Sequence, residues 1–206
     1  NKWIGTFHNP HDDPRNYFNI NDVLRKPERK KDLMECWENL CGVVVFSSEV
    51  KDNYLKYSEF KDKPIYVAKH PTSEPTKKFN YDNFCNSNTK KIIYTGSHLR
   101  DNKLNSFISE NIKNDLTLVD LNEKSVSNDH YDLLLSDSLV FVKYEKIVAS
   151  NLLVECIVRN TPIFVNKLNA VVEYLGESYP LYYDTKEELI SKINNLSAIK
   201  MAHEYL

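Results

Sequence analysis

Residues 150–176 decide the fold and read SNLLVECIVRNTPIFVNKLNAVVEYLG. The first third is apolar on almost every side at helical spacing, which is typical of a buried helix. Ser150 or Asn151 can cap the start of this helix. Asn160 tolerates the left-handed conformation that ends helices, and Pro162 prevents continuation. The β-branched run that follows predicts a strand, and a second helical segment comes after it.

The same alternation of apolar strands and helical segments extends along almost the whole chain. Continuously apolar, β-branched strands are expected where helices cover both faces of a parallel sheet. We therefore predict an α/β fold with parallel sheets. Strands are expected at 3–7, 42–46, 64–68, 91–95, 115–119, 138–142, 162–166 and 180–183, and helices at about 30–41, 49–57, 102–113, 126–136, 149–160, 169–175 and 185–195.

A break in composition divides the chain into two domains, 1–75 and 76–206. Residues 70–84, HPTSEPTKKFNYDNF, contain two prolines and several turn-forming residues without clear periodicity, so we interpret them as a linker. The first domain holds about three predicted strands, too few for a doubly wound domain. We expect it to be incomplete, with further strands upstream of Asn1. The second domain holds about five strands with matching helices.

The composition excludes several classes of partner. The formal net charge is only −2, which gives no electrostatic reason to expect nucleic acid. No run approaches the roughly 18 apolar residues of a membrane span, and the first residues do not form a signal sequence. Cysteines at 36, 41, 85 and 156 lack zinc-site spacing, and we interpret them as small buried residues in a reducing compartment. We expect a cytoplasmic protein without a transmembrane segment.

Glu155 is the charged residue inside the predicted buried helix. A carboxylate at such a position is costly unless it has a partner. One candidate is Arg159, one turn further on in the favourable Glu-then-Arg arrangement. The other is a pair of ribose hydroxyl groups, which one carboxylate can accept together. The spacing alone favours the salt bridge.

ECIVRNTPIFVN (155–166) followed by AVVEYLG (170–176) resembles the donor-site signature of the group 1 glycosyltransferases. Further segments resemble the same family in the expected order: WIGTFHNPHDDP (3–14), FSSEVKDNYL (46–55), KPIYVAKHPT (63–72) and KIIYTGSHLRDNK (91–103). The combination of ECIVRNTP with YPLYY is similar to glycosyltransferase-like proteins of large DNA viruses and some bacteria. The resemblance implies a GT-B-like fold of two Rossmann-like domains, the N-terminal one incomplete in this chain.

The resemblance also implies a function: transfer of a sugar from a nucleotide diphosphate to a carbohydrate or lipid-linked acceptor, without a metal or separate cofactor. Glu155 matches the second glutamate of the family's E-x7-E element, which holds the nucleotide ribose. The first glutamate is replaced by Ile147, so Asn151 or Ser150 would face the donor sugar instead. This departure keeps open an alternative, a catalytically inactive binding or structural module derived from a glycosyltransferase.

The remaining donor-side residues flank predicted strands. Gly96 ends a strand and opens a loop, where the backbone amides of a glycine can approach a phosphate. By resemblance, Arg100 and Lys103 neutralise the diphosphate, whose negative charge grows as it departs. Asn166 and Glu173 bound the loop expected to hold the sugar or phosphate.

His8 and His11 follow the first predicted strand. A histidine at a strand end can orient or deprotonate an acceptor hydroxyl, and a role as ordinary loop residues is an equal alternative. Their H-x-x-H spacing beside two aspartates is a weak metal signal, because it does not lie on a helix, and we expect no metal. A phosphate-binding enzyme of another type, such as a sugar epimerase, would need acid–base residues that this sequence does not reveal.

Overall fold

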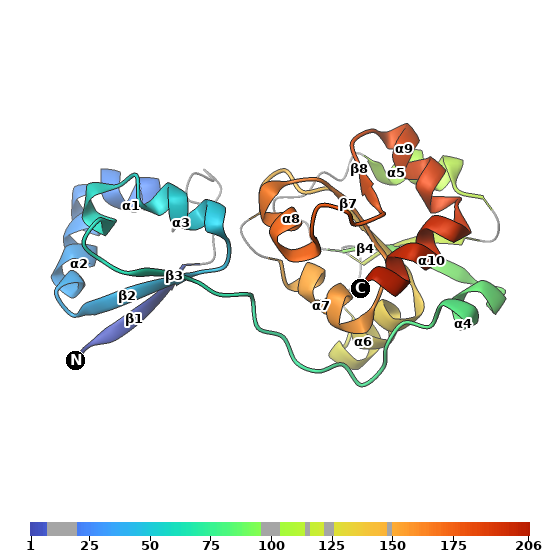
Figure 1. Ribbon diagram of the computed structural model, residues 1–206, viewed down its shortest axis with the longest axis horizontal. Coiled ribbons are helices and arrows are strands. Elements are labelled where there is room, and N and C mark those ends of the chain that lie inside the picture. Colours follow the sequence, from blue (N-terminus) through green and yellow to red (C-terminus); the bar gives the residue numbers. More distant parts are fainter. Residues whose placement is uncertain (8–19, 96–103, 114–115, 122–125, 148–149) are drawn as a thin grey trace. The chain divides into compact units, whose positions relative to one another are not determined.

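The computed structural model describes residues 1–7, 20–95, 104–113, 116–121, 126–147 and 150–206. The chain divides into two compact units (Figure 1). Unit 1 comprises Asn1–His70 with Ile147–Ser150, and unit 2 comprises Pro71–Lys146 with Asn151–Leu206. Each unit contains one parallel sheet.

Unit 1 is a three-stranded parallel sheet whose helices lie on one face (Figure 1). Its elements are β1 (Trp3–Phe7), α1 (Ile20–Arg25), α2 (Pro27–Trp37), β2 (Leu40–Val45), α3 (Ser48–Tyr54), the 3₁₀ turn η1 (Ser58–Phe60) and β3 (Ile65–Val67), with strand order β1-β2-β3. Phe60 is fully buried, and the rings of Trp37 and Tyr54 each lie 4.9 Å from its ring centroid. This aromatic cluster packs the helices onto the sheet.

Unit 2 is built on a five-stranded parallel sheet with strand order β5-β4-β6-β7-β8. Its strands are β4 (Lys90–Tyr94), β5 (Leu116–Asp120), β6 (Leu139–Val142), β7 (Ile163–Asn166) and β8 (Tyr182–Tyr183). Every residue of the central strand β6 is fully buried, because helices cover both faces of the sheet. This burial on both faces explains why the sequence of the strand is continuously apolar.

The helices of unit 2 form two groups on opposite faces of the sheet (Figure 1). Helices α6 (Asn128–Asp137), α7 (Asn151–Arg159) and α8 (Asn169–Leu175) pack in series, and α5 (Leu104–Asn111) packs against α9 (Lys186–Ile193). The remaining helices are α4 (Tyr81–Asn86) and α10 (Leu196–Tyr205). Helix α7 ends as the sequence predicts, with Asn160 in the left-handed region at a φ of 55°.

The structure confirms the predicted α/β class with parallel sheets. Each of the eight predicted strands is found among the described residues, within two residues of its expected bounds. The seven predicted helices are also present, with larger shifts at their ends. Helices α1, α4 and α10 were missed; α1 and α4 have only six residues each, whereas α10 has ten.

The linker predicted over 70–84 is wrong in its C-terminal part, which is folded. Asn80 caps α4 by accepting a hydrogen bond from the Asn83 backbone N–H at 2.8 Å. Phe79 is buried, and its backbone N–H donates to the Arg159 carbonyl oxygen at 2.8 Å. The turn-forming residues that suggested a linker therefore include a helix cap.

Candidate functional site

The strand order of the five-stranded sheet changes direction at one place. From β4 the chain passes outward to β5 and then returns across β4 to β6, β7 and β8. In doubly wound sheets, ligands bind outside the carboxyl ends of the strands that flank such a switch point. Here those strands are β4 and β6, so the segments after Tyr94 and Val142 border the candidate site.

Several predicted site residues lie outside the described residues. These are Gly96, Arg100 and Lys103, which follow β4 in the chain, and His8 and His11, which follow β1. The four others are described: Asn151, Glu155, Asn166 and Glu173.

Asn166 fixes the segment that follows β6. Its Oδ1 accepts a hydrogen bond from the Tyr144 backbone N–H at 2.7 Å, and its Nδ2 donates to the Tyr144 carbonyl oxygen at 3.0 Å. Tyr183 supports the end of the same strand by donating to the Val142 carbonyl oxygen at 3.1 Å. Asn166 lies at the expected sheet edge, and both ends of its amide hold the border of the site.

Asn151 and Glu155 share one face of α7, because they are four residues apart. The helix begins at Asn151, which places Ser150 at the N-cap position. Asn151 is exposed and Glu155 is half-buried one turn further along. Asn151 thus opens a helix that starts at the carboxyl edge of the sheet, where the positive end of the helix dipole favours anions, and Glu155 lies at the middle of that helix.

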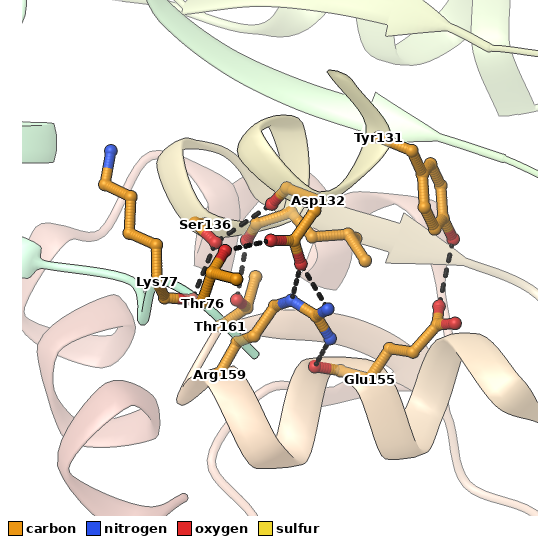
Figure 2. Close-up of polar contacts among 9 residues, drawn as sticks. Thr76, Lys77, Tyr131, Asp132, Ser136, Glu155, Arg159 and Thr161 are labelled. Atoms are coloured by element: carbon orange, nitrogen blue, oxygen red, sulfur yellow. Dashed lines mark hydrogen bonds and ion pairs between the residues drawn. The ribbon is translucent and has the colours of Figure 1, made fainter. Parts of the chain in front are cut away.

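The predicted salt bridge between Glu155 and Arg159 is wrong (Figure 2). Arg159 crosses to α6, where its Nε donates to Asp132 Oδ1 at 2.8 Å and its Nη2 reaches the same oxygen. Its only bond to Glu155 is from Nη1 to the backbone carbonyl oxygen, at 3.0 Å. Among the described residues, the Glu155 carboxylate receives one hydrogen bond, from the Tyr131 hydroxyl to Oε2 at 3.2 Å.

Asp132 is the centre of a polar cluster that the sequence did not reveal. Thr76 donates to its Oδ2 at 2.7 Å, and this bond, followed by the bond from Arg159, lowers the pKa of Asp132. Ser136 Oγ bonds the carbonyl oxygens of Asp132 and Lys77, both at 2.9 Å (Figure 2). The cluster fixes α6 against α7 and attaches residues 76–77 to both. No local pattern predicts it, because the bonds that join its separate segments span 27 to 59 residues.

Glu173 lies half-buried within α8, the helix that follows β7 at the same sheet edge. In the intervening segment Lys167 forms an ion pair with Glu177 at 2.7 Å. Glu173 thus lies on a different helix from Glu155, in the second half of α8.

Asn105 and Asp120 are polar residues at the carboxyl edge that sequence reasoning missed. Asp120 ends β5 and pairs in register with Tyr94 of β4, and Asn105 Nδ2 donates to its Oδ2 at 2.6 Å. Asn105 Oδ1 is buried and has no hydrogen-bond partner among the described residues. The available signal was the position of Asp120, because a polar residue at the carboxyl end of a parallel strand borders the ligand crevice.

No group of three or more histidine, cysteine, aspartate or glutamate residues among the described residues is arranged to hold a metal ion. None of the described helices is both long and apolar enough to cross a membrane.

A doubly wound parallel α/β domain preceded in the chain by a second parallel α/β unit is a GT-B-like fold, the fold of a large class of glycosyltransferases. A solved mutant of TarM from S. aureus, in complex with fondaparinux, α-GlcNAc-glycerol and UDP, matches with a TM-score of 0.64 at 13% identity. A second TarM structure matches with a TM-score of 0.61 at 14% identity, and a GtfA/B complex with 0.50 at 8%.

The matches cover most of this chain and less than half of each neighbour. The two TarM matches span 99% of this chain and 47% and 46% of theirs, and the GtfA/B match spans 86% and 44%. The chain thus has about half the length of these structures, and identities this low establish the fold alone. No family model and no curated protein matches the sequence.

Proposed function

We propose that this chain is part of a glycosyltransferase, and that unit 2 binds the nucleotide-sugar donor at the carboxyl edge of its sheet. The switch point between β4 and β6 supplies the crevice. The S. aureus TarM structure was solved with UDP, which makes a uridine nucleotide the first ligand to test. No disulfide joins the four cysteines, all of which lie among the described residues, and this agrees with the proposed reducing, cytoplasmic location. Their prediction as buried residues holds for Cys156 and is wrong for Cys36 and Cys41, which are exposed.

The proposal rests on the Glu155 carboxylate, because most of its hydrogen-bonding capacity is not used by the described residues. Its carboxylate is half-buried on α7 and engages only the Tyr131 hydroxyl among the described residues, so Oε1 and further lone pairs on Oε2 remain for a ligand. Two adjacent ribose hydroxyls are suitable donors for such a carboxylate. Because Arg159 is bound to Asp132, the salt bridge that competed with this role is absent.

The other predicted residues are assigned around Glu155. Arg100 and Lys103, with the backbone at Gly96, would neutralise the diphosphate as it leaves, aided by the start of α7. Asn151 and Glu173 would face the sugar, and Asn166 would hold the site border in place. His8 or His11 would serve an acceptor hydroxyl of a glycan or lipid-linked sugar. The nucleotide sugar is a substrate, and the mechanism needs no separate cofactor.

A glycosyltransferase-derived module without catalysis is the second candidate. The observation that favours it is Ile147, an aliphatic residue at the position where the related family has its first glutamate. Such a module would bind a nucleotide or glycan but transfer no sugar. Turnover of a nucleotide sugar by a protein containing this chain would exclude it.

Calorimetric titration of the 206-residue chain with UDP, GDP, ADP and their sugar conjugates tests the proposal. A ligand that binds only the folded chain also raises its thermal stability, by roughly 2.7 kcal/mol at a hundredfold excess over Kd. We expect one nucleotide family to bind and stabilise the chain. A well-folded sample that binds none of them would contradict the donor site.

A further inference from the structure

A second hollow in unit 2 lies at the opposite ends of the strands from the candidate donor site. It has a volume of about 340 Å³ and is lined by residues of α4, of α6 and of the starts of β4 and β6. Pockets for small molecules begin at roughly this size, about 300 Å³. Neither the nucleotide nor the acceptor role assigned above uses it.

The two walls of the pocket are single helix faces. His130, Leu134 and Asp137 recur at four- and three-residue spacing along α6, so they point to the same side. Asn83 and Ser87 have the same four-residue spacing at α4. The pocket is therefore enclosed by two helices that both connect to the sheet.

The floor of the pocket contains a buried hydroxyl without a partner. Ser138 immediately precedes β6 and is fully buried, and within the described part of the chain its Oγ makes no hydrogen bond. Buried polar groups are rarely left in this state unless a water, ion or ligand completes them. Ser138 is the observation that points to an occupant.

Lys91 lines the same pocket as this hydroxyl. Lys91 and Ser138 stand one residue before the paired residues Ile92 and Leu139 of β4 and β6, so they are neighbours across the sheet. Lys91 forms no ion pair with any described residue. Asp137 does not offset it, because that carboxylate is bound to Lys77 at 2.5 Å. The pocket therefore offers an uncompensated positive charge.

These groups define the chemistry of the occupant. A lysine and a hydroxyl without a partner among the described residues line the same pocket, and together they favour an oxyanion, most directly a phosphate. The side-chain amide of Asn83 and the remaining lone pairs of Asp137 suit hydroxyl groups, and Leu134 offers apolar surface to a carbon skeleton. We propose that this pocket binds a small phosphorylated polyol of the sugar-phosphate class, with its phosphate at Lys91 and Ser138. The site is independent of the nucleotide bound at the carboxyl edge.

Titration of the full chain with glucose 6-phosphate, followed by amide NMR, tests this proposal. We expect saturable binding with shifts concentrated in residues 80–91 and 130–138, and much weaker effects from glucose or inorganic phosphate alone. Lys91→Met should weaken binding at least tenfold, with Ser138→Ala as a second variant. Lys186→Met, which removes an exposed lysine of α9, should leave affinity unchanged.

The outcomes separate this site from the donor site. If binding is absent, or is the same in Lys91→Met and Ser138→Ala as in the parent chain, the proposal is overturned. If UDP displaces glucose 6-phosphate, and if Glu155→Gln weakens the binding of glucose 6-phosphate, this compound occupies the carboxyl edge. The second site is then also excluded. If Glu155→Gln binds glucose 6-phosphate as the parent chain does, the result supports the second site, even if the chain binds no nucleotide.

Discussion

Asp132 and Glu155 are two carboxylates on neighbouring helices of unit 2, and their surroundings differ in kind. Asp132 receives hydrogen bonds from Thr76 and from Arg159 on both sides of its carboxylate. Among the described residues, Glu155 receives one bond, of 3.2 Å, from Tyr131, which directly precedes Asp132 in the chain. Figure 2 shows Asp132 on α6 and Glu155 on α7, with the Arg159 side chain of α7 directed toward Asp132.

This difference separates a stabilising role from a binding role. At Asp132 the donors of the protein occupy both carboxylate oxygens, so the group contributes to the fold and has little capacity for a ligand. At Glu155 the burial is partial and most of the hydrogen-bonding capacity remains. The following variants test whether Arg159, at the C-terminal end of α7, stabilises the fold through Asp132. They also test whether Glu155, at the middle of the same helix, binds a ligand.

Asp132→Ala should cause the largest loss of stability. It removes the partner of Arg159, whose side chain is only 11% exposed, and leaves a charged group and the Thr76 hydroxyl unpaired. We expect the free energy of unfolding to fall by about 2–3 kcal/mol, measured by urea denaturation. Asp129→Ala, at an exposed site on the same helix, should change it by less than about 1 kcal/mol. Equal losses of stability in Asp132→Ala and Asp129→Ala would contradict a special stabilising role for Asp132.

The contribution of Asp132 should disappear in acid. The bonds from Thr76 and Arg159 hold its pKa below the ordinary value of 3.8. A lowered pKa stabilises the folded state above the unfolded-state pKa, and this stability is lost as the pH falls through the folded-state pKa. The stability gap between the parent chain and Asp132→Asn should therefore be constant near neutral pH and narrow below about pH 4. A gap that widens in acid would contradict this assignment.

Thr76→Val should have a moderate effect, because it removes one donor to Asp132 and keeps the shape of the side chain. We expect a loss of about 1 kcal/mol in unfolding free energy. The exposed Thr72, in the same irregular segment, provides a matched Thr→Val control that should be almost neutral. A neutral Thr76→Val would show that residues 76–77 are not held through this bond.

Tyr131→Phe should have the smallest effect on stability. The hydroxyl makes a long bond to a half-buried carboxylate, so its loss should cost less than about 0.5 kcal/mol in thermal unfolding. If Glu155 binds ribose, this variant should retain nucleotide affinity within about threefold. A large stability loss would instead mean that Glu155 is a structural residue.

Local patterns in the sequence were sufficient to predict the strands and the end of α7. Continuous β-branched runs such as 139–142 and 163–165 become buried strands, and Asn160 adopts the left-handed conformation that its position before Thr161 and Pro162 suggests. The prediction that failed was the partner of Arg159. The helical spacing indicated Glu155, and the actual partner, Asp132, is 27 residues away on another helix.

Contacts between distant segments also limit what the sequence predicts about the two sites. Asn166 was placed at the correct sheet edge, but its bonds to the backbone of Tyr144 depend on how two loops meet. The unpaired hydroxyl of Ser138 and the free charge of Lys91 become neighbours only through the pairing of β4 with β6. Sequence can suggest which residues carry chemistry, and the register between strands decides which of them act together.

The most direct measurement is the affinity of the 206-residue chain and of Glu155→Gln for UDP, measured by titration calorimetry. If Glu155 holds the ribose through charged hydrogen bonds, the variant should bind about 10- to 100-fold more weakly and unfold at nearly the same temperature. Glu187→Gln, at an exposed position on α9, should bind as the parent chain does. Equal affinity of the parent chain and Glu155→Gln would contradict the assignment of Glu155 as the ribose-binding residue.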